Sequence, residues 1–283
     1  MGISKSTVKM ICENEYGRLK HVILCEPKHM SIDGNINETQ KQFKDNQFRK
    51  HRAIKQHQHL IDTLIKHGVQ VSLLPAHKYF PEQVFTRDIG FTVGHTIFVS
   101  NMAHESRVGE ESIFASWLKS RQKPHCHFID NHIEGGDVIV HDGQLFIGLS
   151  HRTNQQAINP IQKVLPKYKI IPVPFSKKYL HLDCVFNIIS ENEALYYPDA
   201  FQQPELDILA EQFDLIPVND EEQFTLGTNV LSLGDKKILS LPINRQINQD
   251  LRNRGFEVIE VDISEIIKSG GSFRCCTLPL LRE

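Results

Sequence analysis

Several features that mark large classes of protein are scarce or missing in this sequence of 283 residues. Only six cysteines are present and none forms a C-x-x-C pair, so we expect no disulfide scaffold and a cytoplasmic location. No apolar run reaches the roughly 18 residues that a membrane-spanning helix needs, so we predict no membrane partner. No apolar segment follows Met1, which predicts that no secretory signal is present.

The chain also lacks an excess of charge of one sign. Its 32 Lys and Arg residues and 34 Asp and Glu residues give a formal net charge of −2, which does not favour nucleic acid as a partner. No GxGxxG motif after a strand, no P-loop and no HExxH motif is found, so we expect neither a cofactor nor a metal. The Met1-Gly2 start with Ser6 fits a short N-myristoylation pattern. No pattern indicates the oligomeric state.

The most informative pattern present is an internal repeat of about 47 residues. Segments with two apolar, β-branched runs around a turn predict β-hairpins that begin at Phe91, Val138, Val185 and Asn229. One more step of this length reaches Cys276, near the end of the chain. We expect the strand from His21 to pair there and to complete a fifth unit.

Each predicted hairpin is followed by a helical stretch and a further strand. After the first hairpin, residues 110–122 carry their large apolar side chains on one helical face, and residues 125–130 read as a strand. Five such units favour a closed, pseudo-symmetric α/β propeller of five blades, with residues 1–283 as one domain. A doubly wound parallel sheet also alternates strands and helices, but antiparallel hairpins argue against it.

Polar residues recur at one phase of this repeat, just before each hairpin. They are spaced by about 47 residues, and they are Asp88, Glu134, His181, Thr228-Asn229 and Cys275. Equivalent positions of a five-fold ring lie at equal distances from its axis. The repeat therefore predicts that these side chains converge at one end of a central channel.

The residue types at this phase indicate a chemistry. A cysteine near a histidine is a nucleophile with a proton partner, so Cys275 and His181 are the candidate catalytic pair, and Arg274 would favour the thiolate. Buried carboxylates such as Asp88 and Glu134 need cationic partners, and a guanidinium matches them geometrically. The thiolate would attack the guanidinium carbon, while His181 protonates the departing amine and then accepts a proton from water.

Each residue also has a structural interpretation when it is taken alone. Asp88 could end a turn, His181 could be a hydrogen-bonded core histidine, and Cys184 could be inert packing. Only one of Cys275 and Cys276 can face the channel, because the two alternate along an extended segment. A second cluster leaves a metal site open as an alternative to a surface strand; it consists of His125, Cys126, His127 and His132.

The motifs FTRD, EGGD and HLD, and the ending RCCTLP, resemble those of the guanidino-group modifying enzyme superfamily, whose fold is the five-bladed pentein propeller. The similarity runs from EYGRLKHVILCEP through GGSFRCCTLPLLR. The motifs are similar to those of arginine deiminases, whereas the compact length resembles dimethylarginine dimethylaminohydrolases. Where deiminases commonly carry an asparagine, this chain has Glu82.

The resemblance implies roles for particular residues. It implies that Cys275 is the nucleophile and that Glu134 supports His181 as acid and base. It further implies that the guanidinium nitrogens are held by Asp88 and Asp183, and that a substrate carboxylate is bound by Arg107 and Arg152.

These observations together predict a cofactor-free cysteine hydrolase that acts on the guanidino group of arginine or an N-substituted arginine. An amidinotransferase, which moves the amidino group to an amine, is the alternative. A non-catalytic binding pentein is a further alternative, although such proteins are expected to lack the Cys-His-acid set.

Overall fold

The computed structural model describes residues 10–32, 39–40, 48–128 and 130–283, and the Met1-Gly2-Ser6 pattern lies outside them. The strands of the described residues form five three-stranded sheets. One sheet contains β1 (Leu19–Cys25), β2 (Gln70–Leu74) and β15 (Leu278–Arg282). A second contains β3 (Gly90–Val93), β4 (Thr96–Val99) and β5 (Cys126–His127). A third contains β6 (Val138–His141), β7 (Gln144–Leu149) and β8 (Lys169–Pro174). The other two contain β9 (Phe186–Ile188), β10 (Glu193–Tyr196) and β11 (Asp214–Pro217); β12 (Leu231–Gly234), β13 (Lys237–Ser240) and β14 (Glu257–Glu260).

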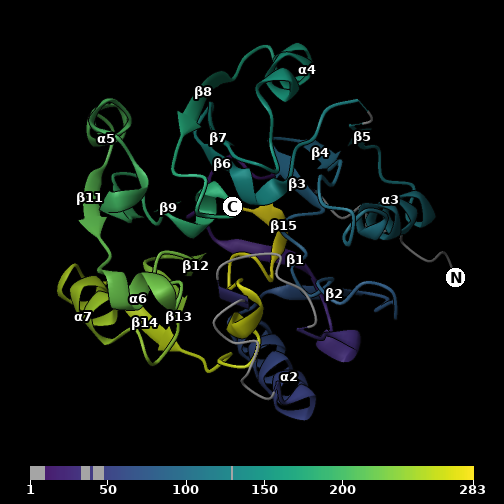
Figure 1. Cartoon of the computed structure of the whole chain (residues 1–283), viewed down its shortest axis with the longest axis horizontal. Helices are drawn as coiled ribbons and strands as arrows, with labels where there is room; N and C mark the ends of the chain where they lie inside the picture. Colours follow the sequence, from purple (N-terminus) through teal and green to yellow (C-terminus); the bar gives the residue numbers. More distant parts are fainter. Residues whose placement is uncertain (1–9, 33–38, 41–47, 129) are drawn as a thin grey trace, which may run out of the picture.

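All five sheets share one construction. The middle strand pairs antiparallel with one neighbour and parallel with the other, and the middle strands are β1, β4, β7, β10 and β13. A parallel partner requires a crossover connection, and here a helix provides it: α2 (Lys50–Lys66), α3 (Glu110–Ser120), α4 (Ile158–Val164), α5 (Gln203–Ala210) or α7 (Arg245–Asn253). Figure 1 shows these helices at the periphery and β3, β6 and β15 near the centre.

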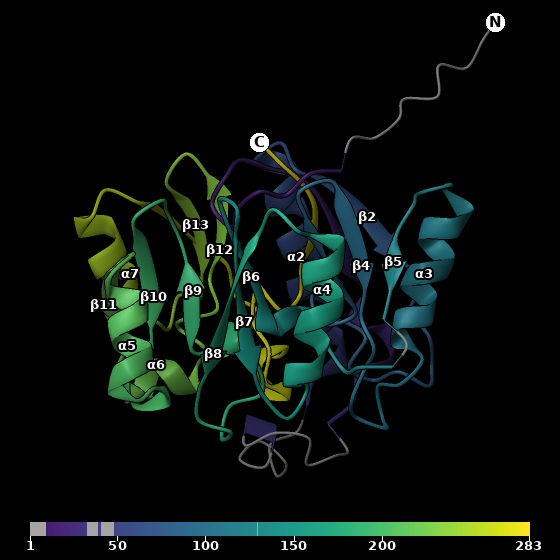
Figure 2. The ribbon, with the colours of Figure 1, turned by 90° about the horizontal axis from the view of Figure 1, so that it is seen from above.

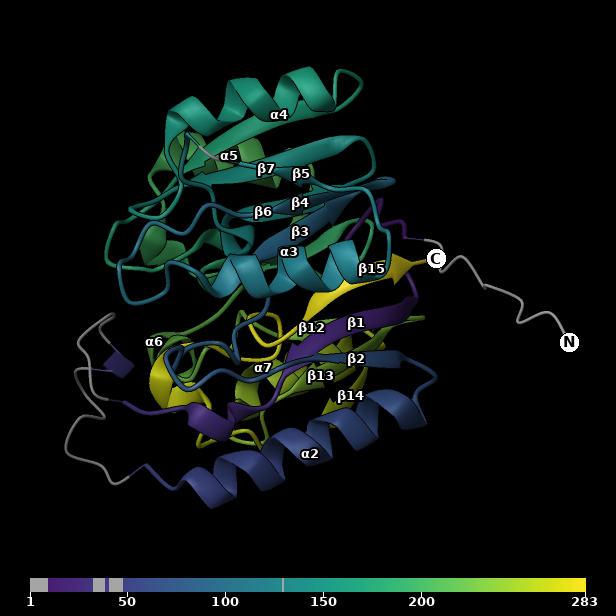
Figure 3. The same ribbon diagram turned by 90° about the vertical axis from the view of Figure 1, so that its right-hand side faces the viewer.

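Shorter helical segments occupy the connections. They are α6 (Asp220–Phe224) and the 3₁₀ turns η1 (Pro27–His29), η2 (Gly135–Asp137), η3 (Gln155–Ala157), η4 (Leu182–Cys184), η5 (Pro198–Ala200) and η6 (Ile267–Ser269). In Figure 2 the sheets stand side by side, and in Figure 3 α2 and α4 lie at opposite edges of the molecule. Among the residues described, no helix combines the length and hydrophobicity needed to cross a bilayer.

The predicted units are found in the structure. All four predicted hairpins form, and β1 pairs antiparallel with β15, which confirms that the N-terminal strand completes the last unit. Five separate sheets are consistent with a five-bladed ring and do not fit the doubly wound alternative. The strand expected over residues 125–130 is shorter than predicted, because only Cys126 and His127 pair with β4.

The hairpin turns follow their sequences. Asp142 and Gly143 between β6 and β7 have φ of 38° and 81°. Two consecutive positive φ angles are those of a type I′ turn, which favours Asp-Gly and matches the twist of the flanking strands. The local sequence therefore favours this turn, and hydrogen bonds from Asn14 and Tyr16 to the Asp142 carboxylate add distant contacts to it.

Helix α2 shows how the peripheral helices are held. Its residues Ala53, Leu60 and Leu64 are fully buried and belong to the same apolar cluster as Val22 and Leu24 of β1. Their spacing places them on one face of the helix. Burial of this face against the sheet, more than helix propensity, stabilises α2.

Replacing Leu60 with Ala is expected to lower the free energy of unfolding by about 2–5 kcal/mol, because it removes buried methyl groups and leaves a cavity. Urea denaturation measures this change. Ile65, on the same helix, is 56% exposed, so Ile65→Ala is the matched control and should change stability by no more than about 0.5 kcal/mol. Equal effects of the two substitutions would contradict this packing of α2.

Candidate active site

The residues predicted from the repeat meet around one narrow cavity. Its lining includes Asp88, Arg107, Arg152, His181 and Cys275. Glu134 contacts His181 from behind, and Asp183 lies beside Cys275. All seven side chains are buried. The predicted convergence is therefore present, although the cavity measures only about 10 Å³, room for about one water molecule.

His181 lies between two carboxylates. Its Nε2 is 2.8 Å from Glu134 Oε2, and its Nδ1 is 3.4 Å from Asp88 Oδ1. Burial disfavours the charged imidazolium, but the charge of Asp88 and the hydrogen bond to Glu134 outweigh it and raise the pKa of His181 to about 10. Burial likewise opposes ionisation of Glu134, yet the contacts with His181 and Arg152 lower its pKa to about 2. His181 is therefore an imidazolium at neutral pH.

The two glycines of EGGD allow this close arrangement. A Cβ on Gly136 would lie 2.7 Å from His181 Cγ and 2.9 Å from Asp88 Oδ1. A Cβ on Gly135 would lie 2.2 Å from the carbonyl oxygen of Arg87. All three distances are shorter than a Cβ atom tolerates, so only glycines let η2 approach the imidazole and the Arg87 backbone this closely.

Cys275 is held by the unit that precedes it. Its backbone N–H donates to Asn229 Oδ1 at 3.1 Å, and Asn229 Nδ2 donates to the carbonyl of Asp183 at 2.9 Å. The Sγ of Cys275 lies 3.9 Å from Asp183 Oδ1. Asn229, which the repeat placed at the common phase without a role, thus fixes the thiol relative to Asp183.

Arg274 has carboxylate partners of its own. It donates to both oxygens of Glu15, at 2.6 and 3.0 Å, and its Nε lies 3.4 Å from Asp183 Oδ2. Burial raises the pKa of Glu15, but Arg274 and Arg87 lower it to about 2. Sequence reasoning missed Glu15, because it lies in an N-terminal segment outside the repeated motifs.

Arg107 is bound differently from the implied role. Its Nη1 donates to Asp88 Oδ2 at 2.5 Å, and its Nε and Nη2 donate to Glu110 Oε2 at 3.1 and 2.7 Å. Nη2 also donates to the carbonyls of Glu82 and Phe85. Most of its donors are therefore engaged by the chain itself, and Glu110 is a partner that the sequence did not indicate.

Arg152 is less engaged than Arg107. Its Nη1 lies 3.4 Å from Glu134 Oε1, a distance beyond that of a good hydrogen bond. It lines the cavity together with Arg107. Of the two arginines, Arg152 has the greater capacity to bind an added carboxylate.

Near His181 and Cys275, two buried carboxylate oxygens accept no hydrogen bond from the described residues: Asp88 Oδ1 and Asp183 Oδ2. Each has a cationic nitrogen at 3.4 Å, His181 Nδ1 and Arg274 Nε respectively. Such a group is unfavourable in a folded protein unless a ligand or water supplies a donor. They lie on residues that flank His181 and Cys275. A planar cation with several N–H donors would satisfy both.

Glu82 also lines the narrow cavity. It accepts hydrogen bonds from Gln40 Nε2 at 3.0 Å and from Ser269 Oγ at 2.6 Å. Burial raises the pKa of Glu82 to about 7, because it outweighs the opposing charge of Arg107. The cavity lining therefore contains a carboxyl group that is held by two neutral donors.

Two clusters bring three potential metal ligands within 4.8 Å of one another: Asp88, Glu134 and His181; and Asp183, Cys184 and Cys275. In the first, both ring nitrogens of His181 face carboxylates, Glu134 and Asp88. Among the described residues, His125, Cys126, His127 and His132 do not form such a cluster.

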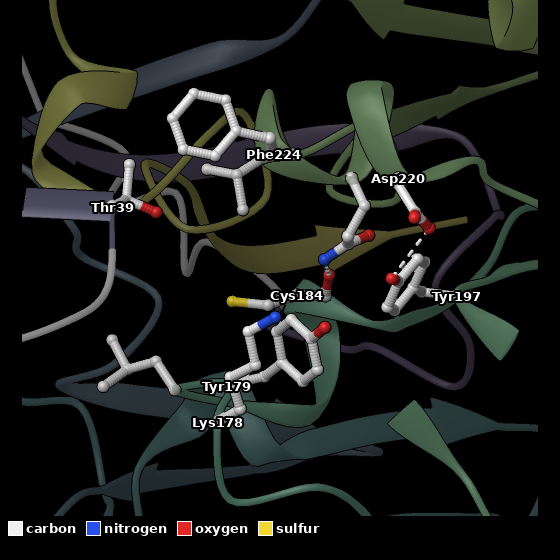
Figure 4. Close-up of a pocket in the computed structure, with 11 residues that line it drawn as sticks. Thr39, Lys178, Tyr179, Cys184, Tyr197, Asp220 and Phe224 are labelled. Carbon is white, nitrogen blue, oxygen red and sulfur yellow. Dashed lines mark hydrogen bonds between the residues drawn. The ribbon is translucent and has the colours of Figure 1, made fainter. Parts of the chain in front are cut away.

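A second, larger cavity of about 270 Å³ adjoins the first and shares Leu180 and Gly270 with it. Figure 4 shows Cys184 within this cavity, with Tyr179, Tyr197, Asp220 and Phe224 around it. Tyr197 donates to Asp220 at 2.9 Å.

The raised pKa of His181 predicts how stability depends on pH. Its ordinary value is 6.5 and its folded value is about 10, so its contribution is complete below pH 6.5 and is lost as the pH rises through 10. The difference in unfolding free energy between the wild type and His181→Gln should therefore narrow over this range, by about 1.4 kcal/mol per pKa unit at most. Denaturation at a series of pH values measures it.

His57→Gln is the matched control for this experiment. His57 is buried, and burial lowers its pKa to about 4, so it stays neutral throughout that pH range. Its effect on stability should not change between pH 6.5 and 10. A constant difference for His181→Gln as well would show that His181 is not held as an imidazolium.

Comparison with known proteins agrees with this geometry. The family "N,N dimethylarginine dimethylhydrolase, eukaryotic" matches residues 26–282. The chain is 52% identical to the protein YkgA of Bacillus subtilis, over 100% of this chain and 99% of that protein. It is 31% identical to the N(G),N(G)-dimethylarginine dimethylaminohydrolase of Mycobacterium tuberculosis, over 80% of this chain and 74% of the relative.

Solved structures show the same similarity. The N-terminal domain of the cyanobacterial arginine dihydrolase ArgZ, a cysteine-to-serine mutant bound to substrate, matches with a TM-score of 0.85 and 25% identity, over 93% of this chain and 98% of that one. The amidinotransferase SxtG of Microseira wollei matches in fold, with a TM-score of 0.83 and 18% identity over 97% of each chain. This chain belongs to the dimethylarginine dimethylhydrolase family, within the superfamily of pentein enzymes that hydrolyse or transfer guanidino groups.

Proposed function

We propose that this protein is a cysteine-dependent hydrolase of arginine or an N-substituted arginine, with Cys275 as nucleophile, His181 as acid and base, and Glu134 as the partner of His181. The observation that carries the proposal is the pair of buried oxygens that accept no hydrogen bond, Asp88 Oδ1 and Asp183 Oδ2, on residues beside the imidazolium and the thiol. Guanidinium N–H groups are the donors that match carboxylates best. The relatives named for arginine and dimethylarginine support the same substrate class.

The reaction follows from these positions. Asp88 and Asp183 hold the guanidinium nitrogens, and the Cys275 sulfur attacks the central carbon. The leaving nitrogen takes the proton on His181 Nδ1, which at 3.4 Å is not tightly bound to Asp88. The departing amine leaves an amidino group on the sulfur. Water then attacks this carbon, His181 accepts a proton from it, and the C–S bond breaks to release a ureido product.

Substrate entry requires a change in the cavity. About 10 Å³ does not admit an arginine, and the Arg107 guanidinium already contacts Asp88 Oδ2. We infer that the substrate guanidinium binds at the other oxygen of Asp88, and that Arg152 binds the substrate carboxylate. Glu82 lines the same cavity and would bind the substrate's ammonium group.

Other parts of the proposal concern the whole chain. We infer one catalytic domain over residues 1–283 with a five-bladed propeller, no metal or cofactor, and a small guanidino compound as partner. The six free cysteines are compatible with a cytoplasmic location.

Amidino transfer to an amine is the second candidate, and the fold similarity to an amidinotransferase is the observation that favours it. Incubation with arginine, with and without glycine or lysine, separates the two. Product formation that requires the added amine would favour transfer, whereas ureido product in water alone favours hydrolysis.

Replacing Cys275 with Ser should lower kcat by at least about a thousandfold, as expected when an enzyme loses its nucleophile. Cys276→Ser is the matched control, because Cys276 is equally buried but does not line the cavity. Turnover of arginine, N-methylarginine and N,N-dimethylarginine measures the effect. Mass spectrometry of the quenched wild type should show an amidino adduct on Cys275, and unchanged turnover in Cys275→Ser would refute the assignment.

Replacing Arg152 with Ala should raise KM for arginine by about 10- to 100-fold, which corresponds to the 1.5–3 kcal/mol of a charged hydrogen bond. KM for agmatine, which lacks the carboxylate, should change much less. Arg107→Ala should instead destabilise the fold by about 3–5 kcal/mol, because it leaves Asp88 and Glu110 buried without their partner. Equal changes in KM for arginine and agmatine in Arg152→Ala would exclude a carboxylate contact.

A further inference from the structure

A second thiol lies close to the proposed nucleophile. The sulfurs of Cys184 and Cys275 and a carboxylate oxygen of Asp183 lie within 4.8 Å of one another. Asp183 Oδ1 is 3.7 Å from Cys184 Sγ and 3.9 Å from Cys275 Sγ, so one carboxylate oxygen contacts both thiols. The mechanism proposed above uses Cys275 and Asp183 but gives Cys184 no part.

The two thiols are held together by hydrogen bonds from one neighbouring unit. Thr228 Oγ1 donates to the carbonyl of Cys184 at 2.5 Å, and Gln223 Nε2 donates to the same carbonyl at 2.8 Å. The next residue, Asn229, accepts from the backbone N–H of Cys275 at 3.1 Å. These bonds fix the backbone of both cysteines near the centre of the molecule, which we call the hub, and so keep the two thiols close together.

Each thiol borders a different cavity. Cys275 lines the narrow catalytic cavity, and Cys184 lines the larger cavity of about 270 Å³. Figure 4 shows Cys184 in the larger cavity. Hydrogen peroxide is among the smallest oxidants, so it is the oxidant that needs the least widening of the narrow cavity beside Cys275.

We propose that Cys184 and Cys275 form a peroxide-reactive pair that closes into a reversible disulfide and switches the enzyme off. This inference rests on the proposed function in one respect, the reactivity of Cys275 as a thiolate. Disulfides in a reducing compartment are commonly transient and redox-sensing, which fits this assignment.

The chemistry balances with hydrogen peroxide as the oxidant. The Cys275 thiolate attacks one peroxide oxygen, an S–O bond forms, the O–O bond breaks, and the released hydroxide takes a proton to become water. The sulfenic acid on Cys275 is then attacked by the Cys184 sulfur, which forms the S–S bond as the S–O bond breaks. Asp183 accepts the proton of Cys184 and passes it to the leaving hydroxide. Two thiols and one peroxide thus give one disulfide and two waters.

Disulfide formation would inactivate Cys275 and would also protect it from irreversible oxidation. A sulfenic acid without a nearby thiol is oxidised further to sulfinic acid, which ordinary thiol reductants do not reverse. Closure of the S–S bond brings the sulfurs to about 2.05 Å and removes the thiolate from the catalytic cavity. Reduction would restore both.

The test treats the wild type with hydrogen peroxide and maps its peptides by mass spectrometry before and after reduction with dithiothreitol. We expect a crosslink between the peptides that carry Cys184 and Cys275, and recovery of most of the initial turnover on reduction. In Cys184→Thr, the expected product is sulfinic acid on Cys275, with recovered activity at least tenfold lower than in the wild type. Each recovery is expressed relative to the same variant before oxidation.

Two further variants keep the test decisive. Cys276→Ser removes the thiol next to the nucleophile and should still form the crosslink. Cys184→Ala repeats the test if Cys184→Thr does not fold. A crosslink from Cys275 to Cys276, or sulfinic acid on Cys275 of the wild type without a crosslink, would overturn the proposal. If the crosslink forms but no guanidine is turned over, the proposed function is refuted and the disulfide proposal is supported. If guanidines are turned over normally but no crosslink forms, the disulfide proposal is refuted and the proposed function is supported.

Discussion

The hub of this protein depends on the pairing of the His181 imidazolium with the carboxylates of Asp88 and Glu134. Each of these charges would be strongly unfavourable if it were buried alone. Together they form a charged cluster in which His181 hydrogen-bonds to Glu134 and lies 3.4 Å from Asp88, so each charge is stabilised by its neighbours. Because the three residues come from three successive units, this pairing also ties those units together at the axis.

The same principle extends around the hub. Arg107 pairs with Asp88 and Glu110, Arg152 lies near Glu134, and Arg274 pairs with Glu15. Carboxylates and arginines alternate, so few charges are buried without a counter-charge. The buried oxygens Asp88 Oδ1 and Asp183 Oδ2, which accept no hydrogen bond, are then the positions where we expect a ligand to bind. A bound guanidinium would supply both the hydrogen-bond donors and the positive charge that these carboxylates lack.

The closed cavity has a consequence for catalysis. A site with room for about one water molecule keeps the electrostatic interactions of its lining strong, because little solvent screens them. It also places the Arg107 guanidinium against Asp88, the kind of contact that an arginine side chain of a substrate would make. The enzyme thus holds an internal guanidinium beside the place where it receives one from outside.

The repeat, the four hairpins and the common phase of Asp88, Glu134, His181 and Cys275 followed from the sequence by itself, because hairpin turns and strand patterns are local and equivalent positions of repeated units converge. The engagement of Arg107 by Asp88 and Glu110, the link from Asn229 to Cys275 and the partnership of Arg274 with Glu15 did not. Nor did the proximity of Cys184 to Cys275. These contacts join side chains from different units, and only the tertiary structure decides which donor reaches which acceptor, because the distances depend on how the units pack.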